Sequence, residues 1–358
     1  MSRTARLEAA RLLARFVALG AEEVEADVLL PADTLLDLYG EDIRGRAFLT
    51  ADPLRGERVL RPDFTVPVVQ RHMETRADPA RYAYAGKVFR KQEDDAERPA
   101  EYLQVGFEVF DGKDPARADA VVFRAVEEAL EGLAVTASTG DIGLLLAAVR
   151  GLDTSAARKA ALLRHIWRPG RFRALLDRFC GRVPVPDSRV ALLAAGDPFA
   201  GAGPEIGLRS RAEVEARIAT LRADAETPPI SEEERALIDA LLAVRGASPE
   251  ALATLRGLAA EMPAIQDAVD RLEARLEALA AAGSDVAALE FEASYGRTTL
   301  EYYDGFVFGF RAAGREMPPV ATGGRYDALT ARLGAGRAAP AVGAVIRPDL
   351  VVSLRGDA

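Results

Sequence analysis

Cysteine, histidine and tryptophan are scarce in this chain of 358 residues, which contains one cysteine, two histidines and one tryptophan. A single Cys180 excludes an internal disulfide and cannot supply the ligand cluster of a structural zinc site. With His72 and His165 as the only histidines, chemistry based on a metal or on a Ser/His pair is disfavoured. We expect both histidines to be packing or surface residues, and we expect no metal and no cofactor.

Long apolar runs and basic clusters are also missing. No apolar run approaches the ~20 residues of a membrane-spanning helix. The N-terminal stretch contains Glu8 and no apolar core of a secretion signal, so we expect a cytoplasmic protein without a membrane partner. The formal net charge is −9, and lysines and arginines occur only as scattered pairs. Because nucleic-acid binders usually carry a basic stripe or module, we expect no nucleic-acid partner, although an acidic protein can still have a basic face.

The most informative stretch is residues 81–110, where two runs of aromatic and β-branched residues flank the acidic residues 93–97. Such residues suit a pleated surface, which predicts two strands joined by a loop longer than a two-residue turn. In the returning strand, Gln104, Gly106 and Glu108 share one face because strand side chains alternate. Gly106 leaves room for something to lie on that face. The alternative is a solvated hairpin with ordinary surface polar groups.

Strand and helix patterns alternate at both ends of the chain, and the middle is helical. We predict helices over 3–19, 32–39 (capped by Asp33 or Thr34), 64–73, 114–132 and 142–149. We predict strands over 24–30, 47–50, 58–60, 135–138, 288–293, 300–310 and 341–346. Residues 155–282 contain little strand pattern, a capping box at Ser231 and Glu234, and an apolar stripe over 265–279 that is typical of core or interface packing. The pattern predicts an α+β sheet domain that carries a helical insertion.

Five short stretches place polar groups in apolar strand surroundings. They are LRPDFT (60–65), the hairpin with Arg90, Gln104 and Glu108, LEYYDGFVF (300–308), TGGRYDAL (322–329) and PAVGAVI (340–346). Each is weak alone, since a GG pair can be a turn. Together and in this order, they resemble the catalytic domain of histidyl-tRNA synthetase, a class II aminoacyl-tRNA synthetase, over roughly residues 5–150 and 288–350.

This resemblance implies a class II synthetase-like antiparallel sheet flanked by helices, with residues 1–150 and 286–358 as the core and 151–285 as a mostly helical insertion. Residues 24–31 resemble motif 1, through which the family usually dimerises, so we expect self-association through this region. Residues 81–110 resemble motif 2, and residues 340–350 resemble motif 3. The chain ends eight residues after Leu350, so we expect no C-terminal anticodon-binding domain.

In that family one pocket binds histidine, and most of its residues have counterparts here. The resemblance implies that Asp63, Thr65 and Gln104 hold the ammonium group and that Glu108 and Tyr303 hold the imidazole, with Asp63 where the family has Glu. A carboxylate suits a cationic amine through a charge-assisted hydrogen bond, and imidazole needs both a donor and an acceptor. The candidate histidine-binding residues are therefore Asp63, Thr65, Arg90, Gln104, Glu108, Tyr302, Tyr303 and Tyr326.

The nucleotide half of the site departs from the family pattern. Arg90 matches the motif 2 arginine, but Gln92 stands where the family has a carboxylate. Thr298 stands where the family has an arginine; Arg297 is adjacent, but a one-residue shift on a strand faces the other side.

Motif 3 departs as well. Leu350 stands near the position of the arginine that stacks on adenine; Arg347 can compensate in part, although Pro348 argues against a matching helix start. Losing one such contact costs about 3–4 kcal/mol of transition-state stabilisation, so we do not expect aminoacylation.

A histidine pocket without adenylation chemistry resembles a second family, the regulatory subunits of ATP phosphoribosyltransferase. That resemblance implies a non-catalytic subunit that joins the short-form catalytic subunit in a hetero-oligomer, activates it and conveys feedback by L-histidine at the first step of histidine biosynthesis. Two alternatives stay open. One is a truncated synthetase-like enzyme that activates histidine with ATP, which Arg90, Arg98 and Tyr102 favour; the other is an interaction domain that has lost every ligand.

Overall fold

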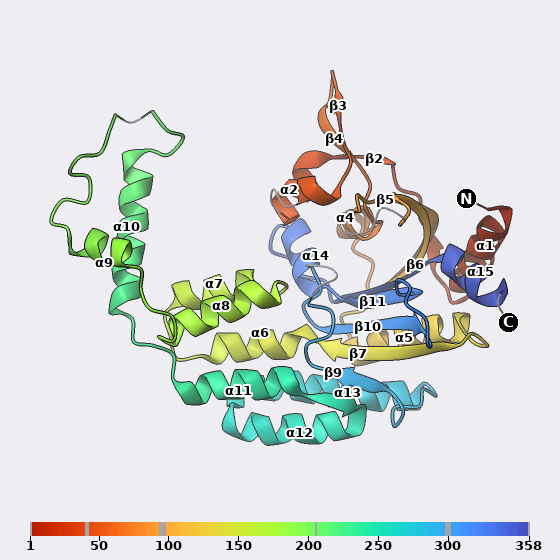
Figure 1. Ribbon diagram of the computed structural model, residues 1–358. Helices are drawn as coiled ribbons and strands as arrows, with labels where there is room; N and C mark the ends of the chain where they lie inside the picture. Colours follow the sequence, from red (N-terminus) through yellow and green to blue (C-terminus); the bar gives the residue numbers. More distant parts are fainter. Residues whose placement is uncertain (1, 40–42, 93–97, 205, 298–301, 357–358) are drawn as a thin grey trace.

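The computed structural model describes residues 2–356 except 40–42, 93–97, 205 and 298–301. Nine strands form one sheet through the centre of the molecule, and three more form a small sheet at its edge (Figure 1). In spatial order the large sheet contains β1 (Glu22–Glu23), β5 (Ala80–Phe89), β6 (Glu101–Phe110), β12 (Ala341–Ile346), β11 (Ala321–Arg325), β10 (Phe306–Ala312), β7 (Val135–Asp141), β9 (Glu290–Glu292) and β8 (Arg245–Ala247). The small sheet contains β2 (Leu29–Pro31), β4 (Gly56–Leu60) and β3 (Leu49–Asp52).

The large sheet is mainly antiparallel; its parallel pairs are β1 with β5 and β7 with β9. The predicted hairpin is confirmed as β5 and β6, with Tyr84 opposite Gly106 and Gly86 opposite Gln104. On the other side of β6, Glu108 pairs with Gly343 of β12. An antiparallel sheet flanked by helices, as predicted, is therefore the frame of the molecule.

Helices cover the sheet, and the helix α5 shows how a capping residue determines where a helix begins. Near the chain ends, α1 (Arg3–Ala18) lies beside α15 (Pro348–Gly356) (Figure 1). Asp114 caps α5 (Pro115–Ala129), which has proline in its first turn as predicted. The smaller helices of this part are α2 (Ala32–Tyr39), α3 (Ile43–Arg46), α4 (Thr65–Thr75) and α14 (Asp327–Leu333).

The middle of the chain is helical, as expected. It contains α6 (Ile142–Gly151), α7 (Ala156–Arg164), α8 (Pro169–Phe179), α9 (Asp187–Ala194), α10 (Arg211–Glu226), α11 (Glu232–Ala243), α12 (Ser248–Glu261), the 3-10 helix η2 (Pro263–Ile265) and α13 (Gln266–Ala281). The capping box at Ser231 and Glu234 is confirmed, and the stripe from Ile265 to Leu279 is buried core packing. Figure 1 shows α9 and α10 farthest from the sheet. None of the described helices has the length and apolar character of a membrane span.

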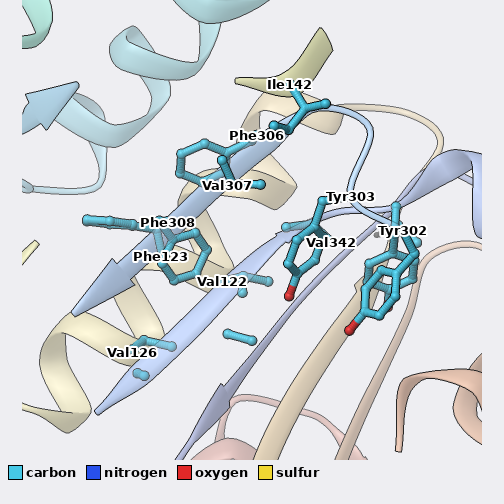
Figure 2. Close-up of a cluster of buried hydrophobic side chains, with 14 of the residues drawn as sticks. Val122, Phe123, Val126, Ile142, Tyr302, Tyr303, Phe306, Val307, Phe308 and Val342 are labelled. Atoms are coloured by element: carbon cyan, nitrogen blue, oxygen red, sulfur yellow. The ribbon is translucent and has the colours of Figure 1, made fainter. Parts of the chain in front are cut away.

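Aromatic side chains fill the space between the sheet and α5 (Figure 2). Phe306 and Phe308 alternate along β10 and pack on Phe123 of α5, with ring centroids 6.3 and 5.2 Å apart. Figure 2 shows Tyr302 and Tyr303 beside this cluster. The segment that leads into β10 therefore lies against a packed core.

The strand predicted over residues 24–30 is confirmed only at its end, where residues 29 and 30 belong to β2. Residues 24–28 are not a strand, because the chain there crosses from one sheet to the other. Val24 donates its backbone N–H to Ala83 beside the large sheet, at 2.8 Å. The side chain of Arg61 donates a hydrogen bond to the carbonyl of Ala26, and the backbone N–H of Arg61 donates one to the carbonyl of Val28. Arg61, a residue distant in sequence, thus bonds to the segment that separates β1 from β2.

Three further predictions need correction. Helix α2 begins at Ala32, so the predicted caps Asp33 and Thr34 lie inside it. The strand predicted over 300–310 begins only at Phe306; residues 300 and 301 lie outside the described part. Strand β11 was not predicted, because its glycine pair suggested a turn.

Proline at 348 does not prevent a helix, since α15 begins there. Proline fits the first helical position because a backbone N–H there would have no acceptor within the helix. The other predicted elements lie within three residues of the observed ones.

Candidate functional site

Glu108 of β6 lies at the centre of a buried polar cluster and is 1% exposed. Tyr84 donates its hydroxyl to Oε1 at 2.8 Å, and Tyr326 donates to Oε2 at 2.6 Å. Thr65, at the start of α4, donates to Oε1 at 3.4 Å. The opposite residue is Gly343, where any Cβ atom would overlap the Glu108 carboxylate. The missing side chain on β12 therefore makes the space that this carboxylate occupies.

Burial raises the pKa of Glu108 to about 7, and the three hydroxyl donors hold it from rising further. Burial, helped by the charge of Glu108, keeps the pKa values of Tyr84 and Tyr326 well above their usual value, so both remain neutral donors. A free imidazole has a pKa near 6.5. Glu108 and an imidazole would therefore titrate in the same range and could share a proton in a charge-assisted hydrogen bond.

Gly106 does leave room for another group, and that group is Tyr84 of the protein itself. A Cβ atom at Gly106 would overlap the Tyr84 ring. Phe64 stacks on the other face of Tyr84 with centroids 4.4 Å apart, and the guanidinium of Arg61 lies 4.0 Å from the Phe64 centroid. Gly86 gives these two groups their space on β5. This stack fixes the hydroxyl of Tyr84 toward Glu108.

Asp63, Arg90 and Gln104 form the polar part of the site on the loop before α4 and on the hairpin. Burial raises the pKa of Asp63, and the charge of Arg90 offsets part of that rise. Arg90 donates its Nε–H to the Pro62 carbonyl at 2.7 Å. Gln104 is 2% exposed, and its Oε1 has no hydrogen-bond partner among the described residues. An unpaired buried amide oxygen costs about 1–3 kcal/mol, which a ligand N–H would recover.

Tyr302 and Tyr303 close the cluster from the segment before β10. Their ring centroids are 4.8 Å apart, and Figure 2 shows both hydroxyls on the same side. The Tyr302 hydroxyl lies 3.5 Å from Oγ1 of Thr65, and the Tyr303 ring fills the space over Gly324. Burial raises the pKa values of both tyrosines. Both therefore stay neutral and able to donate a hydrogen bond.

The structure brings the candidate residues together, with Arg90 half-buried and the others buried. Hydrogen bonds join Thr65, Glu108, Tyr302 and Tyr326, and electrostatic contact joins Asp63 with Arg90. The alternative of a solvated hairpin is wrong, since residues 102–110 are all buried. Sequence reasoning missed Tyr84 as a site residue. An aromatic ring paired with a glycine indicates such packing, but the pairing of Tyr84 with Gly106 is given by the register of the structure.

In the region that corresponds to the nucleotide half of a synthetase site, Gln92 and Arg347 contact other residues of the protein. Gln92 donates its Nε2–H to the carbonyls of Arg90 and Pro99, each at 3.3 Å, and so ties the ends of the hairpin loop. The guanidinium of Arg347 lies 5.0 Å from the Tyr102 ring centroid. Thr298 lies outside the described residues. Among the residues described, no group of three His, Cys, Asp or Glu side chains is arranged to hold a metal ion.

Arg297 lies in a turn, so the strand on which its orientation was judged does not exist there. Its Nε–H bonds to the Ile166 carbonyl at 2.9 Å, and its guanidinium lies 5.0 Å from the Phe172 centroid. Burial lowers its pKa to about 10. Arg297 therefore attaches the connection between α7 and α8 to the central sheet region.

Comparison with known proteins defines the class. The histidyl-tRNA synthetase family model matches residues 2–196 and 209–351. A solved structure titled ATP phosphoribosyltransferase regulatory subunit/histidyl-tRNA synthetase, from Bacillus halodurans, has a TM-score of 0.70 and 22% identity and covers 98% of this chain and 79% of that one. A histidine–tRNA ligase subunit from Alicyclobacillus acidocaldarius has a TM-score of 0.62 and 24% identity, with 99% and 93% covered. The fold is that of a histidyl-tRNA synthetase-like protein.

Curated relatives narrow the class to one family. Proteins from Brucella canis and Brucella suis are 35% identical to this chain over 367 aligned residues, with 94% of each chain covered. Both are named ATP phosphoribosyltransferase regulatory subunit. The chain belongs to the family of ATP phosphoribosyltransferase regulatory subunits.

Proposed function

We propose that this chain is a non-catalytic allosteric subunit of ATP phosphoribosyltransferase. It activates the short-form catalytic subunit in a hetero-oligomer and conveys histidine feedback at the first step of histidine biosynthesis. The observation that carries the proposal is the buried cluster around Glu108, in which Gln104 keeps an unpaired amide oxygen. Membership of a regulatory-subunit family supports the same role.

The proposed ligand is L-histidine, held at two ends of the cluster. Asp63 and the free oxygen of Gln104 suit the ammonium group, and Arg90 suits the carboxylate. Glu108 and Tyr303 suit the imidazole, because one accepts and the other donates. A wrong amino acid would leave these buried groups unpaired, which is the basis of strong discrimination.

The proposed feedback requires that histidine bind two states of the complex with different affinities. The cluster draws its residues from four separate segments: the loop before α4, the hairpin, the segment before β10, and the turn into α14. A ligand that contacts all four segments favours one arrangement of them. This is the differential contact that a feedback signal needs.

Self-association is proposed to use residues 24–31. In this segment Val28 and Leu29 expose 42% and 43% of their surface, although apolar side chains of this size are usually buried. The neighbouring strand β1 is the edge of the large sheet. A second copy that covers this segment would bury both side chains.

Reconstitution with a short-form catalytic subunit tests the proposal. We expect the two chains to co-purify, the phosphoribosyl transfer rate to rise in the complex, and histidine to lower it. Gln104→Ala should keep the activation and lose the inhibition by histidine. Failure of the chains to associate, or a rate that this chain does not change, would contradict the proposal.

A second candidate, activation of histidine with ATP, is favoured by the arginines near Tyr102. Burial, together with the positive charges of Arg90 and Arg98, lowers the pKa of Arg347. Positive charge is therefore concentrated around Tyr102. Histidine-dependent pyrophosphate exchange is the test. We expect none, because Gln92 cannot replace a metal-binding carboxylate.

A further inference from the structure

A second cavity, of about 410 Å³, lies between the connection of α7 to α8 and the helix α14. This volume is within the range of roughly 300–1,000 Å³ of small-molecule sites. Among the described residues, Tyr302 is the one that lines this cavity and also belongs to the Glu108 cluster. The lining residues that carry charge or a ring nitrogen are Arg164, His165, Trp167, Arg168, Asp304 and Arg332.

The cavity wall is rich in positive charge, although the whole chain has a net charge of −9. Arg164, Arg168 and Arg332 contribute three guanidinium groups, and Asp304 is the one carboxylate among the described residues that line the cavity. Asp304 is already engaged, because it accepts the backbone N–H groups of Asp327 and Ala328 at 3.0 and 2.6 Å. Its pKa is raised to about 7, chiefly by burial. Asp304 therefore offers little opposing charge to Arg164 and Arg332.

Several polar nitrogens at the wall have no partner in the described part of the chain. Nε1 of Trp167 and Nδ1 of His165 are buried without a hydrogen bond. The exposed guanidinium of Arg164 forms no hydrogen bond or ion pair with the described residues. Buried polar groups in folded proteins are nearly always paired, so unpaired nitrogens beside a cavity indicate a partner that enters from outside.

The wall is also held in place before any ligand arrives. Ile166, between His165 and Trp167, is fully buried, and Arg297 bonds to its carbonyl at 2.9 Å. On the other side, Arg332 donates to the carbonyl of Leu38 at 3.2 Å. A site that is ordered in advance binds without the cost of ordering its own side chains.

We propose that this cavity binds a phosphorylated small molecule with a planar ring, of the size of a nucleoside monophosphate. Guanidinium groups match phosphate oxygens in paired hydrogen bonds. Trp167 and Tyr302 offer aromatic surface for the ring. The hydroxyl of Tyr302 lies 3.5 Å from Thr65 in the Glu108 cluster. A ligand in the cavity that moves Tyr302 would therefore also change the contacts of the Glu108 cluster.

Fluorescence of Trp167 gives a direct test, because this residue is the chain's one tryptophan. Adenosine monophosphate added to the full chain should change the fluorescence to saturation, with weaker binding at higher salt. Adenosine, which lacks the phosphate, should bind at least about tenfold more weakly. Equilibrium dialysis with labelled nucleotide gives a second readout that does not depend on the ring's signal.

Arg164→Gln and Arg332→Gln should each weaken nucleotide binding by about tenfold, since each removes one charged hydrogen-bond donor. Arg222→Gln is the matched control: it makes the same charge change on an exposed face of α10 and should leave binding unchanged. Calorimetry with histidine on the same variants separates this site from the Glu108 site. No saturable binding by either readout, unchanged affinity in both variants, or equal affinity for sulfate would overturn the proposal.

Discussion

At the scale of single residues, Glu108 determines the chemistry of the site. A carboxylate buried among the hydroxyls of Thr65, Tyr84 and Tyr326 pays a desolvation penalty that three hydrogen bonds offset only in part. Its proton is therefore held more tightly in the folded protein than in the unfolded chain. This difference predicts a dependence of stability on pH.

The pKa of Glu108 is about 7 in the folded protein, against 4.5 for the unperturbed group. The folded state then binds the extra proton between these values, so this contribution to stability is full below pH 4.5 and is lost as the pH rises through 7. Glu108→Gln removes the titration. Urea unfolding over this range should show the variant gaining about 3 kcal/mol relative to wild type as the pH rises.

Asp304 also titrates near pH 7, but it is present in both proteins and its effect cancels in the difference. If the difference in unfolding free energy between wild type and Glu108→Gln stays constant with pH, the raised pKa of Glu108 is refuted.

At the scale of elements, glycines decide how the strands present the site. Gly106, Gly343 and Gly324 lie on adjacent strands and make space for Tyr84, Glu108 and Tyr303, respectively. Polar and aromatic groups can thus lie flat on the sheet and remain buried.

Gly343→Ala should lower the free energy of unfolding by about 1–3 kcal/mol, because the new methyl group overlaps the Glu108 carboxylate. Gly257→Ala is the control. It lies exposed inside α12, a Cβ atom there meets nothing within 4 Å, and alanine should stabilise the helix by about 1 kcal/mol. Denaturant melts of both variants check this; a neutral Gly343→Ala would contradict the close packing.

Sequence patterns predicted the elements whose stability is local. Helices α5 and α13 have a cap or an apolar stripe of their own, and β6 has the alternation that puts Gln104 and Glu108 on one face. The segment that separates β1 from β2 bonds to Arg61, which is more than thirty residues away. Strand β11 depends on close approach of neighbouring aromatic rings. Tyr84 joins the site through the hairpin register, which the sequence pattern alone does not determine.

At the scale of the whole molecule, buried charges join the helical middle to the sheet. Arg275 of α13 donates to Asp119 of α5 and to Asp141 at the end of β7, each at 2.8 Å. Arg325 of β11 also bonds to Asp119. All four side chains are buried, so the network couples four elements, α5, β7, α13 and β11.

Arg275→Met should cost about 3–5 kcal/mol of stability, because it leaves the buried carboxylate of Asp141 without a charged partner and that of Asp119 with Arg325 alone. Arg256→Met makes the same substitution at an exposed pair with Glu273 and should cost at most about 1 kcal/mol. Thermal and denaturant unfolding of the two variants measure the contrast. Equal losses would show that the buried network does not join the elements energetically.

Titration of L-histidine into the purified chain by calorimetry tests the central claim most directly. The account predicts saturable heat for the wild type, and at about 100 times the dissociation constant histidine should add ~2.7 kcal/mol to the free energy of unfolding. Gln104→Ala and Glu108→Ala should lose the heat, while Gln70→Ala, on the exposed face of α4, should keep it. No heat with the wild type, or unchanged affinity in both site variants, would contradict the account.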